Sequence, residues 1–244
     1  MSQLIKSSTL VLVTISLLAI SILAQTMDSG AFGTGSGYSD AEAYWNTTRF
    51  EVPLMTSIEK KLLLLSPDLK ATYKDFLQQK DSGLIRLLPR ELSNPKKSLA
   101  GGAYYSFGQQ YYGGSRGADI RLEKNFFFTG GGGANLGFMV NLGDVSLDSI
   151  SSDTSAISYV AQYSAPKKAT AARSDFLKFQ QGENIGTVLY KSSLPVIANN
   201  TYVLRSVQYR KSNTLVAFRV IKQDDNGSAI LLWKILKEYS VPSL

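Results

Sequence analysis

The sequence predicts an α+β fold, in which an N-terminal helical pair packs on an antiparallel, meander-type β-sheet. Helix start signals gather in residues 56–80, and the apolar side chains of residues 99–239 recur with the period of two that β-strands show. Helices and strands segregated along a chain are typical of this class. A β-sandwich, or a small barrel with a helical appendage, is the alternative that the pattern leaves open.

The densest apolar content lies in residues 199–239, which predict a three-stranded antiparallel meander. Its first strand alternates between two faces, with Arg205 beside Val203 and Val207 on one of them. The second and third are longer apolar runs rich in β-branched and aromatic residues, as expected of strands buried on much of both faces. The expected strands are residues 201–210, 214–223 and 229–237.

Two turns connect these strands, at residues 211–213 and 224–228. The second contains Asn226 and Gly227, a pair that tolerates positive φ. A helix over residues 229–239 is the rival interpretation, because Leu, Lys and Glu dominate that stretch. The hairpin turn directly before it favours a strand.

Two short helices are expected before the sheet. Thr56 and Glu59 have the spacing of a capping box, and Ser66 with Pro67 opens the second helix as N-cap and first helical residue. An apolar stripe on the first helix, formed by Ile58, Leu62 and Leu65, is expected to cover the sheet. Docking of the two helices on a membrane surface is the alternative, because Lys60, Lys61, Lys70 and Lys74 lie opposite their apolar sides.

Shorter patterns complete the expected sheet of roughly six to eight strands. They predict strands within residues 103–112, 117–128, 136–145, 156–164 and 185–190. A short helix is expected at residues 174–181, capped by Ser174 or Asp175. The glycine run that begins at Gly130 is interpreted as a hairpin loop.

The N-terminal residues predict export. Lys6 supplies a positive charge, residues 10–23 form an apolar core, and Ala24 offers a small residue at the cleavage point, as in a signal peptide. We therefore expect a periplasmic, cell-surface or secreted bacterial protein that is not integral to a membrane after cleavage, with an uncleaved anchor as the alternative. The expected organisation is a signal peptide (1–24), a flexible Gly/Ser-rich tether (25–45), a helical segment (46–95) and an antiparallel β-rich domain (96–244).

The chain contains no cysteine and no histidine. This composition excludes disulfides, Ser-His-Asp and Cys-His catalysis, thiol redox chemistry and the usual zinc ligands. Residues 113–117 match the G-x-S-x-G pattern, but the chain has no histidine to take the serine proton and the next residues look like a strand. Asp144, Asp148 and Asp153 lack the alternate-residue spacing of a calcium loop. We expect no cofactor, no metal and no enzymatic activity.

These observations predict a non-catalytic exported domain that binds a ligand or partner. The net charge of +7 favours an anionic glycan, a lipid or envelope surface, or a protein partner, and export argues against nucleic acid. A glycan-active hydrolase that uses two carboxylates, and a structural or assembly protein of the cell envelope, are the alternatives.

Six residues are the candidate ligand-binding side chains. Four tyrosines on the strand at residues 103–112 offer stacking surfaces for sugars, with packing at a core edge as the alternative. Two arginines lie inside the meander. If either arginine is buried, a carboxylate from elsewhere must meet it. The candidates are Tyr104, Tyr105, Tyr111, Tyr112, Arg205 and Arg219.

Overall fold

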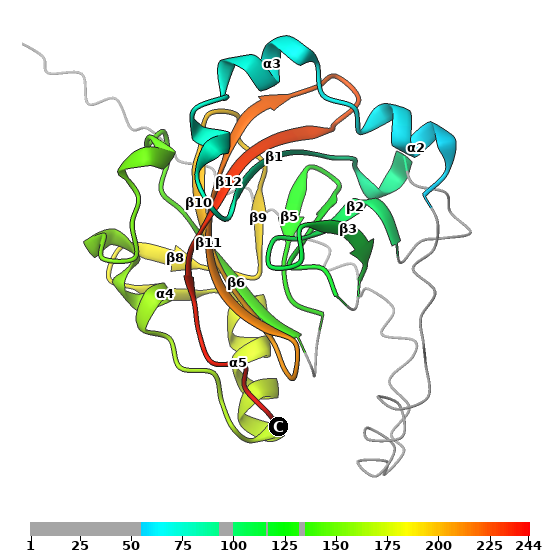
Figure 1. Ribbon diagram of the computed structural model, residues 1–244. Coiled ribbons are helices and arrows are strands. Elements are labelled where there is room, and N and C mark those ends of the chain that lie inside the picture. The colour runs from blue at the N-terminus through cyan, green and yellow to red at the C-terminus, as the bar shows by residue number, and fades with distance from the viewer. Residues whose placement is uncertain (1–54, 93–99, 116, 132–134) are drawn as a thin grey trace, which may run out of the picture. The chain divides into compact units, whose positions relative to one another are not determined.

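Two five-stranded antiparallel sheets form the framework of the protein (Figure 1). The computed structural model describes residues 55–92, 100–115, 117–131 and 135–244, all of which belong to one compact unit, Phe50–Leu244. The predicted signal peptide and tether lie outside the described residues. Within the described residues, no helix is both long and apolar enough to cross a membrane.

The first sheet, sheet A, confirms the predicted meander. Its strand order is β1-β12-β11-β10-β6, and β10, β11 and β12 are consecutive neighbours. The helical interpretation of residues 229–239 is wrong, because β12 pairs with both β1 and β11. The strands are β1 (Ser82–Leu87), β6 (Asn135–Asn141), β10 (Thr201–Gln208), β11 (Ser212–Gln223) and β12 (Ala229–Glu238).

The second sheet, sheet B, has the order β3-β2-β4-β5-β9. Its strands are β2 (Ala100–Ser106), β3 (Tyr111–Gly114), β4 (Ile120–Glu123), β5 (Phe126–Phe128) and β9 (Ser193–Pro195). A separate hairpin joins β7 (Glu183–Ile185) to β8 (Val188–Tyr190). The tyrosine-rich stretch and the stretch at residues 117–128 each form a pair of strands, so the prediction of antiparallel β-structure is confirmed.

Aromatic side chains from both sheets form one core between them. Phe218 of β11 stacks on Phe107 with 6.0 Å between ring centroids and meets Phe127 of β5 edge-on at 5.2 Å. Trp233 of β12 meets Phe107 edge-on with 5.3 Å between ring centroids. The two sheets therefore pack face to face, as in the sandwich that the sequence left open. Neither sheet closes into a barrel within the part of the chain that the structure describes.

Helices cover the opposite face of sheet A. These are α4 (Ser158–Gln162) and α5 (Ala169–Gln181), with short 3-10 turns at Leu147–Ser149 and Ser155–Ile157. Phe179 of α5 stacks on Phe138 of β6 with 3.8 Å between ring centroids. Sheet A is thus buried on both faces, and this accounts for the long apolar runs of its central strands.

Two predictions in this helical layer are wrong. Residues 156–164 were expected to form a strand, but they form a 3-10 turn and α4, because Ile157 and Val160 are buried at a helical spacing of three. Helix α5 begins at Ala169, ahead of the expected residue 174. Its N-cap is Lys168 and has no side-chain hydrogen bond, so neither Ser174 nor Asp175 caps it.

The two N-terminal helices are α2 (Ser57–Leu62) and α3 (Pro67–Thr72), and their predicted caps are present. Thr56 Oγ1 accepts from the Glu59 amide at 3.1 Å, while Glu59 Oε2 accepts from the Thr56 amide at 2.9 Å. The predicted apolar stripe is wrong at Ile58, which is 69% exposed. The capping box turns Glu59 inward in its place.

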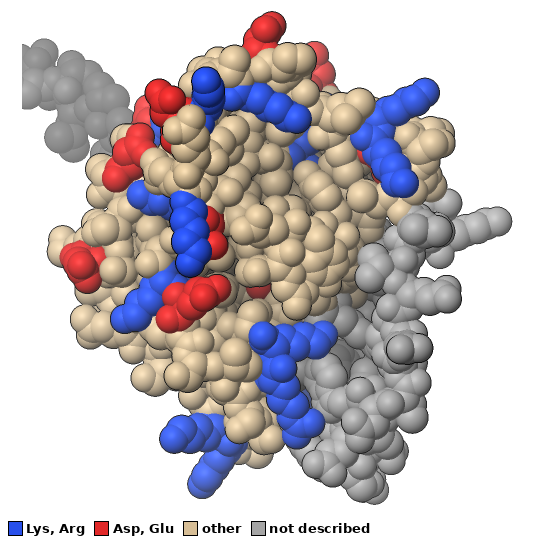
Figure 2. Space-filling view, in the orientation of Figure 1, with Lys and Arg blue, Asp and Glu red and all other residues tan. Residues whose placement is uncertain are grey.

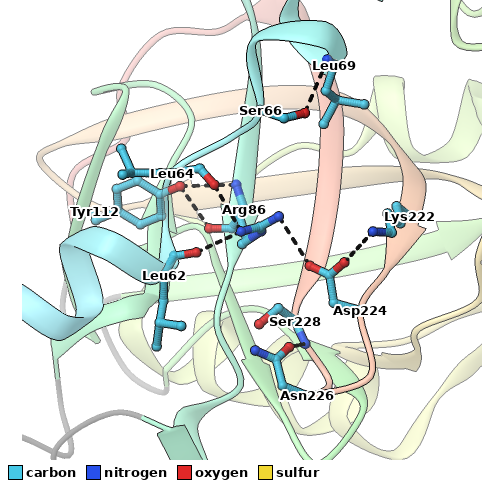
Figure 3. Close-up of polar contacts among 10 residues, drawn as sticks. All are labelled: Leu62, Leu64, Ser66, Leu69, Arg86, Tyr112, Lys222, Asp224, Asn226 and Ser228. Atoms are coloured by element: carbon cyan, nitrogen blue, oxygen red, sulfur yellow. Dashed lines mark hydrogen bonds and ion pairs between the residues drawn. The ribbon is translucent and has the colours of Figure 1, made fainter.

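Arg86 of β1 fastens the end of α2 to sheet A (Figure 3). Its Nη1 donates to the carbonyl oxygens of Leu62 and Leu64 at 2.9 Å each, which are the kind of groups that a helix end leaves unpaired. Its Nη2 lies 3.3 Å from Asp224 Oδ2, and the other oxygen of that carboxylate pairs with Lys222 at 2.9 Å. Arg86 is therefore a structural arginine with an acidic partner.

Candidate functional site

A cavity of about 670 Å³ lies between the α4–α5 connection (residues 163–168) and the segment that follows β12 (residues 240–244). Its cationic side chains are Arg205 and Lys167, and no described Asp or Glu lines it. The other lining residues include the polar Gln162, Ser164, Asn213, Ser240 and Ser243 and the apolar Ala165, Val241 and Pro242. Leu244 also lines it, and among the lining side chains the two positive charges are not balanced by an acidic one.

The alternation of β10 places Arg205 at this cavity. Val203 and Val207 pack under the helical layer, whereas Tyr202 and Leu204 point into the core between the sheets. Arg205 shares the face of the two valines and is only 1% exposed. The strand pattern predicted this face correctly, but not the burial of the charge.

The contacts of the Arg205 guanidinium leave much of its hydrogen-bonding capacity unused. Its Cζ lies 3.5 Å from the centroid of the Tyr239 ring, a cation–π contact. Its Nη2 donates to the Tyr163 carbonyl oxygen over a long 3.5 Å. Its Nε and Nη1 are buried and have no hydrogen-bond partner within the described chain. Burial lowers the pKa of Arg205 to about 10, and Tyr239 and Tyr163 oppose this shift.

No carboxylate of the described residues pairs with Arg205, so the expected acidic partner is missing. Asp175 of α5 contacts Tyr163 of the same site, but its carboxylate accepts a 2.5 Å hydrogen bond from the Tyr163 hydroxyl. Burial and this bond raise the pKa of Tyr163 well above its usual range. Within the described residues, the expectation that a protein carboxylate meets a buried Arg205 is not met.

Tyrosines that directly follow β12 and β10 hold α4 and the α4–α5 connection in place. The Tyr239 hydroxyl donates to the Ala161 carbonyl oxygen at 2.6 Å, and the Tyr209 hydroxyl donates to that of Pro166 at 2.8 Å. On the other wall, Asn213 Nδ2 donates to the Ser240 carbonyl oxygen at 2.8 Å. Both walls are thus anchored to the sheet that carries Arg205, and such anchoring makes the cavity preorganised.

Arg219, the second predicted arginine, lies elsewhere and is already paired. Its Nη2 lies 2.6 Å from Asp144 Oδ1, and its Nη1 donates to the Val145 carbonyl oxygen at 2.8 Å. It pairs with Thr201 across the sheet, four residues before Arg205, which places it about 13 Å along β10. The structure therefore separates the two arginines, and only Arg205 reaches the cavity.

The four candidate tyrosines stay on β2 and β3, away from this cavity. Tyr104 and Tyr105 are both buried, at 1% and 4% exposure, and point to opposite faces of β2. Tyr105 and Tyr112 meet edge-on with 5.1 Å between ring centroids. The Tyr111 ring covers Gly113, where an added Cβ would lie 2.6 Å from it. These rings are engaged in packing.

Buried tyrosines predict how the fold responds to alkaline pH. Burial raises the pKa of Tyr112, Tyr202 and Tyr209 to about 12. A tyrosine in the unfolded chain ionises near pH 10. The stability that the neutral, buried tyrosines contribute to the folded protein is therefore complete below pH 10 and is lost as the pH rises from 10 towards 12. We expect the free energy of unfolding to fall by up to about 1.4 kcal/mol per pH unit for each fully buried tyrosine.

Denaturant unfolding at a series of alkaline pH values, followed together with tyrosinate absorbance, checks this expectation. The folded protein should contain tyrosines that ionise well above pH 10, and its stability should fall over the same pH range. A single titration of all tyrosines near the ordinary pKa would contradict the burial described above.

Three residues of the site, Tyr163, Asn213 and Tyr239, were not among the sequence-based candidates. Asn213 was assigned to a turn, but the turn occupies residues 209–211, with Arg210 at φ +64°, and β11 already begins at Ser212. The interior charge at Arg205 was the one sequence signal that led to this cavity. The contribution of Tyr163 had no such signal, because its stretch was interpreted as a strand.

A second, smaller cavity of about 300 Å³ shares Gln162 with the first. Among its described lining residues, Asp153 is the acidic side chain and Lys237 the cationic one. Glycoside hydrolysis needs two carboxyl groups about 5–10 Å apart, and the lining of neither cavity provides such a pair. The described residues also contain no cluster of three or more potential metal-ligating side chains.

The charged side chains do not form one broad basic surface on the face shown in Figure 2, where Lys and Arg occur in separate groups, several of them beside Asp or Glu. Arg205 combines deep burial with the lack of an acidic partner among the described residues. Comparison of the chain with protein-family models, with curated proteins and with solved structures found no match.

Proposed function

We propose that this protein is an exported, non-catalytic binding domain that holds an anionic ligand in the Arg205 cavity. The observation that carries the proposal is a buried guanidinium with two unpartnered nitrogen atoms, in a cavity whose described lining contains no acid. The leader at residues 1–24 supports export.

The energetic argument rests on the cost of a buried charge. Removing a cation from water costs several kcal/mol unless an anion or a full set of acceptors replaces the water. Arg205 has a ring face and one long hydrogen bond, which offset only part of this cost. A carboxylate or phosphate bound at Nε or Nη1 would supply the missing charge-assisted hydrogen bonds.

Arg86 shows what the same side chain does when its role is structural. Its guanidinium has two carbonyl acceptors and the Asp224 carboxylate, all from this chain, and its Nε alone is buried without a hydrogen-bond partner. Arg205 has no such set, although it is the more deeply buried of the two. This difference favours a binding role over a structural one.

Isothermal titration calorimetry of the purified protein with small carboxylates and with inorganic phosphate tests the proposal. We expect at least one anion to bind, and Arg205→Met to weaken that binding by at least about thirtyfold, because truncating a buried charge pair costs about 2–5 kcal/mol. Arg219→Met is the matched control and should leave the affinity unchanged. Absence of anion binding by the unmodified protein, or equal loss in both variants, would contradict the proposal.

A further inference from the structure

The Arg205 cavity also contains an unpartnered acceptor. The Asn213 side chain is 6% exposed, and its Oδ1 has no hydrogen-bond partner among the described residues. The amide orientation is fixed, because Nδ2 donates to the Ser240 carbonyl oxygen at 2.8 Å. Two lining residues of the cavity thus have unpartnered polar atoms, which are donors at Arg205 and an acceptor at Asn213.

The two groups are close neighbours on one face of sheet A. Asn213 of β11 lies opposite Val207, and Leu215 lies opposite Arg205. Asn213 and Arg205 are thus diagonal neighbours, whose backbones are about 7–8 Å apart in such a sheet. Side chains of this length that line the same cavity can contact two substituents of one small molecule.

Resting on the anion site proposed above, we propose that the ligand is a hydroxy-substituted carboxylic acid, a class that includes sugar acids. Its carboxylate pairs with Arg205, and its hydroxyl group donates to Asn213 Oδ1. A buried carbonyl oxygen needs a donor, and an unsubstituted carboxylate offers none. The apolar Ala165, Val241 and Pro242 in the lining favour an organic acid over an inorganic anion.

The charge of the cavity selects the kind of donor. An ammonium group could also donate to Asn213, but Arg205 and Lys167 would repel it, and no described acidic side chain lines the cavity to offset that repulsion. A hydroxyl group donates without adding positive charge. Hydroxy acids are therefore preferred over amino acids that have the same carbon skeleton.

Three ligands that differ in a single group provide the test: mandelate, phenylacetate and phenylglycine, which carry a hydroxyl, a hydrogen and an ammonium group at the same carbon. We expect calorimetry to show mandelate binding about fivefold more tightly than phenylacetate, as one neutral hydrogen bond predicts, and phenylglycine binding most weakly. In Asn213→Leu the ratio between mandelate and phenylacetate should fall to about one. The ratio isolates the hydroxyl contact, because loss of the Ser240 hydrogen bond affects both ligands alike.

The outcomes separate this inference from the anion site itself. If mandelate and phenylacetate bind equally well and both depend on Arg205, the hydroxyl contact is overturned and the anion site stands. If phenylglycine binds as tightly as mandelate, the preference for a neutral donor is overturned. If none of the three ligands binds, both proposals fail for organic acids. Asn213→Ala, which removes the acceptor as well, replaces Asn213→Leu if the leucine variant does not fold.

Discussion

Replacing Asp119 by alanine is expected to lower the free energy of unfolding by about 3–5 kcal/mol, the range found when a buried, bonded charge network is broken. Asp119 is 1% exposed and lies between the two sheets. Its Oδ1 accepts from Ser206 Oγ and Gln208 Nε2 of β10, each at 2.6 Å. Its Oδ2 accepts from the Phe107 amide at 2.7 Å. Alanine would leave these donors buried without an acceptor.

The size of this effect follows from the number of donors that converge on one carboxylate. Ser106 Oγ and the Gly108 amide also donate to Oδ2, at 3.1 and 3.4 Å. Hydrogen bonds to a charged group contribute about 1.5–3 kcal/mol each, and their loss is less than additive. Asp119 thereby ties β10 of sheet A to the end of β2 in sheet B.

Chemical denaturation of Asp119→Ala beside Asp144→Ala checks this result. Asp144 is a matched control because its side chain is 74% exposed and its ion pair with Arg219 is expected to contribute no more than about 1 kcal/mol. Asp119→Asn should lower the free energy of unfolding by an intermediate amount. Its amide keeps one acceptor oxygen but places an NH2 donor against donor groups that the carboxylate had bound. Similar losses in the Asp119 and Asp144 alanine variants would contradict a structural role for this network.

The second large effect has the opposite sign: Arg205→Met is expected to raise the free energy of unfolding of the ligand-free protein by about 1–3 kcal/mol. Methionine keeps much of the side-chain volume and can contact the Tyr239 ring through its sulfur. The variant loses the cation–π contact and the long bond to Tyr163, but it no longer buries a charge with two unpartnered nitrogen atoms. Substitutions that raise the stability of a protein while removing its binding activity are typical of functional sites.

Arg86→Met is the control for this prediction. It should destabilise the protein, because the carbonyl oxygens of Leu62 and Leu64 and the Asp224 carboxylate would lose their partner. Thermal and denaturant unfolding of both variants, without ligand, gives the comparison. If Arg205→Met destabilises the protein as much as Arg86→Met does, Arg205 is a structural residue and the binding proposal loses its basis.

Local sequence patterns predicted the local elements well. The capping box at Thr56, the N-cap at Ser66, the meander and the turn around Asn226 and Gly227 depend on neighbours within a few residues, and each is present. At Ile58 the local pattern failed, because the helix start turned Glu59 inward. No strand was predicted where β1 forms, since its pairing with β12 joins segments far apart in the chain.

The candidate site was less predictable, because it depends on long-range contacts. Arg205 stood out as a charge inside an apolar strand, but its surroundings come from Tyr163, Asn213 and Tyr239 on three other segments. The expected acidic partner followed from a general rule about buried charges. By this rule a buried charge is paired with an opposite charge, and the described chain supplies none for Arg205. This mismatch is why we assign the cavity to an external anion.

The most direct test of this account is to observe the Arg205 guanidinium itself during a ligand titration. The side-chain Nε–H resonance of Arg205, assigned by its disappearance in Arg205→Met, should shift in a saturable manner as mandelate is added. The Nε–H resonance of Arg219 should stay in place, because that guanidinium already pairs with Asp144. Saturable binding that leaves the Arg205 resonance unmoved would contradict the central claim that this buried arginine holds the ligand.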